Sequence, residues 1–154
     1  MKSEEAKETK EQGGENAVQC RGWTAGTILL VLALAINCVI TYPLSLMILI
    51  IKPERIDKVY GVDTEARRIL GCMYLAIAIV SSLAMAVWIA KRNIHKTLVL
   101  AVPLFAVQII YKVASAFAVG LQDKNPVIIA NLGVVAFQLL TLAFNRDDVA
   151  QVFL

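Results

Sequence analysis

Four long apolar runs constrain the fold of this chain more than any other feature of its sequence. They cover residues 23–51, 69–90, 97–121 and 127–144. Each reaches the roughly 18 to 25 apolar residues that a helix needs to cross about 30 Å of hydrocarbon. With 58% hydrophobic and only 18% charged residues, the chain is far more apolar than an ordinary soluble domain. The sequence therefore predicts an integral, multi-pass membrane protein.

The connections between these runs predict how the helices pack. Residues 91–96 and 122–126 are tight turns, which force neighbouring helices to run antiparallel. The first run is longer than one span requires, so we expect it to tilt or to bend at Pro43, whose missing N–H opens the backbone ladder. We expect an all-α, up-down bundle of four transmembrane helices within residues 23–144.

The first connection, KPERIDKVYGVDTEARR, is expected to form a short interfacial helix lying on the membrane. Pro53 suits its first turn, and Ile56, Val59 and Tyr60 fall on one side. Acidic residues are interleaved with the basic ones, which also fits an ordinary solvated surface. The basic residues expected to contact anionic lipid headgroups are Arg55, Lys58, Arg67 and Arg68.

Hydrophilic segments flank the bundle. Residues 1–22 are rich in Glu and Lys with almost nothing to bury, so we expect a disordered tail or an arm that orders on a partner. Residues 145–154 are expected to form a short C-terminal tail. Its end, from Val152 to Leu154, would rest on the membrane or a neighbouring subunit, or add as a strand to a PDZ-type groove.

The orientation of the bundle follows only weakly from charge. An acidic start and an overlong first apolar run argue against a cleaved signal peptide. The distribution of Lys and Arg near the helix ends slightly favours both termini in the cytoplasm. The sequence names no organelle.

Residues that membrane enzymes use are missing from the four runs. Asp and Glu are absent from all of them, which leaves no carboxylate for a proton relay or for general acid catalysis in the membrane. His95 is the single histidine, and Cys20, Cys38 and Cys72 lack the spacing of metal or redox motifs. Cys20, beside the membrane entry, could carry a palmitoyl chain. We expect no enzymatic activity, no cofactor and no metal site.

One ionisable residue lies deep in the third run. Lys112 is about nine residues, or roughly 14 Å, from the end of that run. A charge there costs about 3 kcal/mol or more unless it is solvated or paired, so Lys112 should face the inside of the bundle. Gln108 and Ser115 share its helical face.

The other three runs carry polar residues at a similar depth, and we expect them to form one polar layer with Lys112. They are Asn37, Thr41 and Tyr42 in the first run, Ser81 and Ser82 in the second, and Gln138 and Thr141 in the fourth. Two interpretations follow. The layer either joins the helices, at about 0.6 to 2 kcal/mol for each contact, or forms a hydrated pocket in which Lys112 is the cation.

The order of the segments resembles that of small four-helix membrane proteins, grouped as DoxX-like proteins and related domains of unknown function. The stretch EARRILGCMY leads into the second run, and KRNIHK forms the basic turn after it. In that family an Arg followed by a Gly opens the second helix, and Arg68 and Gly71 match those positions. The layout is also similar to the four-helix scaffold proteins of ergosterol biosynthesis, in which an Ala-Arg pair and a Gly stand where Ala66, Arg67 and Gly71 stand here. Those proteins carry an acidic residue in the third helix, whereas this chain has Lys112.

Two classes of function follow from these observations. The sequence favours a non-enzymatic accessory or scaffold subunit of a larger membrane assembly, because such a subunit needs only helix faces. Ala78, Ser82 and Ala86 repeat every four residues, which suits close helix packing within the bundle or in a homodimer. The alternative is a binder or carrier of a lipid or a small anionic ligand at the polar layer around Lys112. The expected partners are membrane lipids and other membrane subunits, and not nucleic acid.

Overall fold

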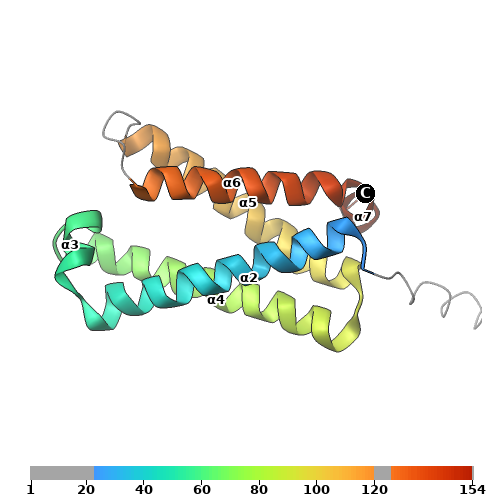
Figure 1. Ribbon diagram of the computed structural model, residues 1–154, viewed down its shortest axis with the longest axis horizontal. Coiled ribbons are helices and arrows are strands. Elements are labelled where there is room, and N and C mark those ends of the chain that lie inside the picture. The colour runs from blue at the N-terminus through green and yellow to red at the C-terminus, as the bar shows by residue number, and fades with distance from the viewer. Residues whose placement is uncertain (1–22, 120–125, 154) are drawn as a thin grey trace, which may run out of the picture.

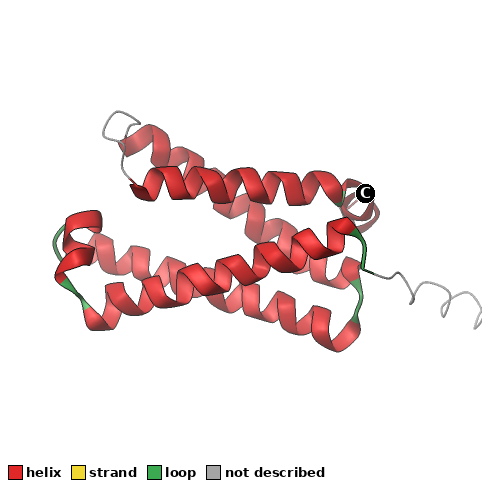
Figure 2. Cartoon of the chain, viewed as in Figure 1, coloured by secondary structure: helices red, strands yellow, loops and turns green. Residues whose placement is uncertain are grey.

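Four long helices dominate the computed structural model, which describes residues 23–119 and 126–153 (Figure 1). They are α2, Ala25–Leu46, continued by the π-helical turn η2, Met47–Ile51; α4, Glu65–Lys91; α5, Ile94–Val119; and α6, Pro126–Phe144. Figure 2 shows that the described residues fold into helices and loops, without a strand. All 4 helices are long enough and apolar enough to cross a membrane. The expected fold, an all-α up-down bundle, is confirmed.

Capping residues explain where these helices begin. The side chain of Thr24 accepts a hydrogen bond from the Thr27 backbone N–H, and that of Thr64 accepts one from the Arg67 backbone N–H. Both satisfy a donor that the first helical turn leaves free. Because of the cap at Thr64, α4 begins at Glu65 rather than at residue 69, where the apolar run starts.

The helix α2 passes through Pro43, and its hydrogen-bonding pattern changes only after that residue. Pro43 lies on the exposed side of α2. The π-helical turn follows at Met47–Ile51, where the Lys52 N–H bonds to the Met47 carbonyl at 2.8 Å. Lys52 then ends the first span in a left-handed conformation, with φ of 48°.

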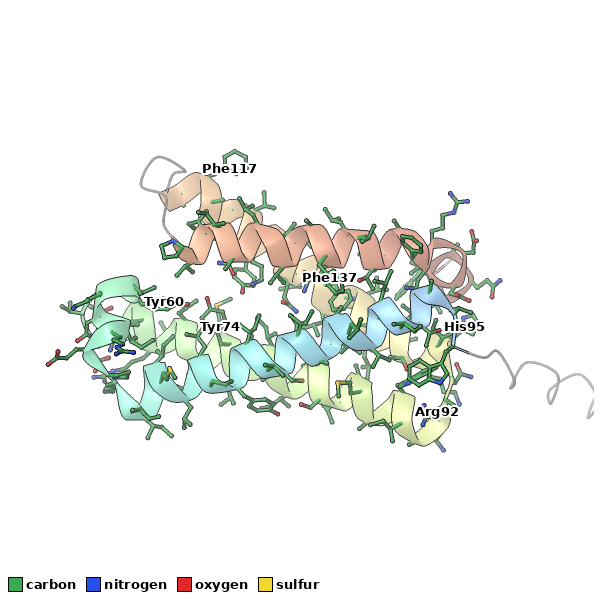
Figure 3. All side chains as sticks on the ribbon, in the orientation of Figure 1. Tyr60, Tyr74, Arg92, His95, Phe117 and Phe137 are labelled. Atoms are coloured by element: carbon green, nitrogen blue, oxygen red, sulfur yellow. The ribbon has the colours of Figure 1, made fainter. Side chains whose placement is uncertain are left out.

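The connection between α2 and α4 contains the expected short helix, α3, Glu54–Tyr60. Its Ile56 is buried in a hydrophobic cluster with Ile48, Tyr74 and Ile77, which we call the loop cluster. Tyr60 packs edge-on against Tyr74, with ring centroids 6.5 Å apart (Figure 3). This burial raises the pKa of the Tyr60 phenol above its ordinary value, so the ring stays neutral.

A second hydrophobic cluster, the terminal cluster, occupies the other end of the bundle. Its buried residues come from α2, α4 and α5, and Phe137 of α6 packs against them (Figure 3). The loop cluster differs because α6 contributes no described residue to it. Figure 1 agrees: α6 lies apart from α3 at one end of the bundle and comes close to the start of α2 at the other. The residues that form the terminal cluster are Leu30, Ala33, Leu34, Ala84, Leu98, Ala101 and Phe105.

The C-terminal residues, expected to be a tail, form the helix α7, Arg146–Phe153. Val149 and Val152 pack against the terminal cluster, which explains why this segment is not extended. Asn145, at the junction of α6 and α7, donates hydrogen bonds to the carbonyls of Gly26 and Thr141 at 3.0 and 2.8 Å. A strand for a PDZ-type groove would require this helix to unfold. The predicted N-terminal tail and Cys20 lie outside the described residues.

Candidate intramembrane polar site

Lys112 lies on α5 with its side chain inside the bundle. The residue is only 5% exposed. Its Nζ donates a hydrogen bond to Oδ1 of Asn131 on α6 at 2.7 Å and lies 5.3 Å from the centre of the Tyr111 ring. Within the described part of the chain, Asn131 is its one hydrogen-bond acceptor. The charge is therefore held by an amide dipole and an aromatic ring and not by a carboxylate.

A second pair of polar side chains joins the same two helices deeper in the bundle. Gln138 Nε2 donates to Gln108 Oε1 at 3.0 Å, and both residues are 1% exposed. Together with Lys112 and Asn131 they make up what we call the α5/α6 seam. Gln108 stands one helical turn before Lys112 on the same face.

The hydrogen bonding of this seam is incomplete. Gln108 Nε2, Gln138 Oε1 and the Tyr111 hydroxyl are buried and have no hydrogen-bond partner among the described residues. Exchanging the oxygen and nitrogen of both amides would again leave one donor and one acceptor unpaired. The seam can therefore offer a guest both hydrogen-bond donors and an acceptor beside a buried cation.

The polar residues of the first two spans form a separate group, the α2/α4 seam. Asn37 Nδ2 donates to Ser81 Oγ at 3.2 Å. Ser82 Oγ hydrogen-bonds with the Tyr42 hydroxyl at 3.1 Å and with the Cys38 thiol at 3.4 Å. These contacts join α2 to α4, and none of them reaches Lys112.

Three further hydroxyls from the expected layer bond within their own helices. Thr41 donates to the Asn37 carbonyl, Ser115 to the Lys112 carbonyl and Thr141 to the Phe137 carbonyl. Such bonds satisfy the hydroxyl without a second helix. Hydrogen bonds thus divide the expected layer into two seams and three hydroxyls that bond to their own backbone.

Asn131 is the site residue that sequence reasoning missed. It lies five residues after Pro126, and Lys112 lies seven residues before Val119, about 8 and 10 Å along their helices. Because α5 and α6 run antiparallel, similar distances from their shared end place the two side chains at the same level. Counting depth from that end of each run would have found this pair.

Arg67 is a correction to the expected lipid-headgroup contacts. It is 3% exposed, and its Nη1 donates to the Asp57 carboxylate and to the Gly61 carbonyl. Both acceptors belong to the connection that contains α3, so Arg67 ties this connection to α4. Its guanidinium is not available to a headgroup, whereas Arg55 and Lys58 are exposed.

Arg68 lies on the surface, in an ion-pair network with the same connection. Its Nε and Nη2 donate to the Asp63 carboxylate at 3.0 and 2.9 Å, and Lys52 Nζ donates to it at 2.6 Å. Hydrogen bonds from Arg68 and Lys52 hold the pKa of Asp63 well below its usual range. These ion pairs hold the connection that contains α3 against Lys52, at the end of the π-helical turn, and against the start of α4.

The fold defines a small multi-pass membrane protein of four spans. Comparisons of the chain with protein-family models, with curated proteins and with solved structures found no match. The resemblance to DoxX-like proteins and to the ergosterol scaffold proteins therefore stays an expectation from the sequence. A fold of this kind does not by itself define a function, which depends on the residues of the site.

Proposed function

We propose that this chain is a non-enzymatic, multi-pass membrane protein that binds a lipid or a small anionic ligand at Lys112. The observation that carries the proposal is the incomplete hydrogen bonding around this buried cation. A buried donor or acceptor left without a partner costs about 1–3 kcal/mol. A polar guest that supplies the missing partners would remove this cost.

The α2/α4 seam provides an internal comparison. Its Asn37–Ser81 pair also joins two helices through buried polar side chains, yet neither residue has an atom among the buried, unpartnered side-chain atoms of the described residues. This chain can therefore join two helices through buried polar side chains without leaving a fully buried side-chain atom unpartnered. The α5/α6 seam, which is not completed, is the better candidate for a binding site.

A second candidate function is that of an accessory or scaffold subunit in a larger membrane assembly, the class that the sequence favours. The outward face of α4 supports it, because each end of that face carries two small residues four positions apart, where another helix can approach closely. For such a subunit we expect an orientation with both termini in the cytoplasm. The small exposed residues are Cys72, Ala76, Ala86 and Ala90.

Replacing Lys112 by Met tests the binding proposal, because the substitution keeps the length of the side chain and removes its charge. We expect Lys112→Met to insert and to purify in mild detergent but to lose a small molecule that co-purifies with the wild type, as detected by native mass spectrometry. The matched control is Lys58→Met, which removes an exposed charge from α3 and should keep that molecule.

Two outcomes contradict the binding proposal. One is a wild-type protein that carries no small molecule, and the other is a Lys112→Met protein that carries the same molecule at the same occupancy. If the seam only joins helices, Lys112→Met should be as stable as the wild type or more stable, because a buried charge is expensive unless well paired. Migration of the wild type with a large complex would then favour the accessory subunit.

A further inference from the structure

The α5/α6 seam carries one positive charge, which limits the charge of its guest. Lys112 is the one buried cation that α5 and α6 contribute in the described part of the chain. A single ammonium can neutralise a monoanion. A phosphate monoester, with about −1.5 to −2 charges, would leave an unpaired charge in a medium of low dielectric constant. The charge of the site therefore favours a monoanionic group.

The hydrogen-bond donors of the seam match the oxygens of a carboxylate. The Lys112 ammonium has three N–H groups and gives one to Asn131, while the Tyr111 hydroxyl and the amide NH2 of Gln108 have no acceptor among the described residues. Tyr111, Lys112 and Gln108 lie within about one turn of α5. A carboxylate has two oxygens that accept several hydrogen bonds each, so its acceptors suit a site that offers several donors.

The depth of the seam indicates from which side an attached chain would reach it. Lys112 is about 10 Å inside the end of α5, a level that a slender amphiphile can reach from the adjoining leaflet. At this end Tyr111 packs against the loop cluster, to which α6 contributes no described residue.

We infer, building on the proposed function, that the Lys112 site binds the carboxylate of a long-chain, single-tailed amphiphile of the fatty-acid class. The carboxylate is held by Lys112, Tyr111 and the amide of the Gln108–Gln138 pair, and the apolar tail extends from there toward the leaflet at the end of the bundle that carries α3. A double-tailed phospholipid is a poorer fit, because its phosphodiester stays at the level of the headgroups.

The test measures binding of four probes to the full-length protein in neutral lipid nanodiscs. Oleate is the expected ligand, oleyl alcohol lacks its charge, acetate lacks its tail, and phosphatidylglycerol carries its charge on a phosphodiester. We expect saturable binding of oleate, binding of oleyl alcohol at least tenfold weaker, and no measurable binding of acetate. Phosphatidylglycerol in the nanodisc should not compete with oleate.

Two variants locate the binding. Lys112→Met should weaken oleate binding at least tenfold. Tyr111→Phe breaks no hydrogen bond of the described residues, because the hydroxyl has no partner there, so it should fold as well as the wild type and bind oleate about tenfold more weakly. Ser81→Ala, which removes a hydroxyl from the α2/α4 seam, is the matched control and should bind oleate normally.

The outcomes separate this inference from the proposed function. Lys112-dependent binding of phosphatidylglycerol without binding of oleate overturns the carboxylate and keeps a lipid site at Lys112. Equal binding of oleate by wild type and Tyr111→Phe overturns the arrangement of donors, even if Lys112→Met does not fold. Absence of Lys112-dependent binding of every probe overturns the carboxylate inference. If, in addition, no small molecule co-purifies with the wild type, the proposed function fails as well. In that case, loss of a protein subunit from the Lys112→Met variant would indicate that Lys112 pairs with an acidic side chain of a partner protein.

Discussion

At the scale of single residues, glycines set how closely some segments of this bundle approach. A Cβ on Gly26 would lie 2.5 Å from Asn145 Oδ1 and 3.1 Å from the Phe144 carbonyl oxygen. A Cβ on Gly71 would lie 2.8 Å from the Ile48 side chain and 2.9 Å from that of Leu49. Gly26 thus allows the contact between α2 and the α6–α7 junction, and Gly71 allows the contact between α4 and η2.

A first prediction compares two Gly→Ala substitutions in helices. Gly26→Ala should destabilise the protein by about 1–3 kcal/mol, because the new methyl group overlaps Asn145 and disturbs its bond to the Gly26 carbonyl. Gly133→Ala on α6 meets nothing within 4 Å and should be neutral or stabilising by up to about 1 kcal/mol. Unfolding in mixed micelles with increasing denaturing detergent measures both changes. Equal stability of the two variants would show that the contact at Gly26 is unimportant.

At the scale of elements, α7 shows how a short polar segment becomes a helix when it has a surface to pack on. Asp147 and Asp148 lie in its first turn, where acidic side chains interact favourably with the helix dipole. Val149 and Val152 bury their methyl groups against the terminal cluster, and His95 of α5 lies 3.9 Å from Asp148. An isolated helix of this length would be marginal in water, so packing decides its conformation.

A second prediction concerns the valines of α7. Replacing Val149 and Val152 together by Ser should destabilise the bundle by roughly 2 kcal/mol, because two partly buried side chains lose their apolar contacts. Gln151→Ser, at an exposed position of the same helix, should leave stability unchanged. The thermal unfolding midpoint in mild detergent reports the difference. A double variant that unfolds with the wild type would mean that α7 is not part of the folded unit.

At the scale of the whole molecule, the up-down arrangement relates the two ends of the described chain. Figure 1 shows the start of α2 and the helix α7 at one end of the bundle, with α3 at the other. The turn between α4 and α5 lies at the first of these ends, together with Trp23, Trp88 and Arg92, which form an aromatic and cation–π cluster. A membrane crossed by all four helices would separate the two ends.

A third prediction follows for topology. In a variant without the native cysteines, single cysteines replacing Lys91 and Arg146 should react with an impermeant maleimide from the same compartment. A cysteine replacing Glu54 of α3 should react from the opposite compartment, because an odd number of spans separates it from the other two. All three positions are exposed. Reaction of positions 91 and 146 from opposite sides would contradict the four-span arrangement.

The sequence by itself determined the four apolar helices and the burial of Lys112. Helix length and apolar content are local properties of the chain, and a bilayer leaves few alternatives to a helix. A charge at that depth has to face inward for energetic reasons that need no knowledge of its neighbours.

The tertiary structure alone decided which polar side chains meet. The rotation and register of each helix depend on packing around its whole circumference, so the sequence did not reveal that Lys112 pairs with Asn131, or that Asn37 pairs with Ser81 in a separate seam. Arg67 and Arg68 are neighbours of the same type, yet one is buried beneath α3 and the other is on the surface. Each residue along a helix turns by about 100°, so adjacent side chains face different surroundings, and only the packed bundle determines what those surroundings are.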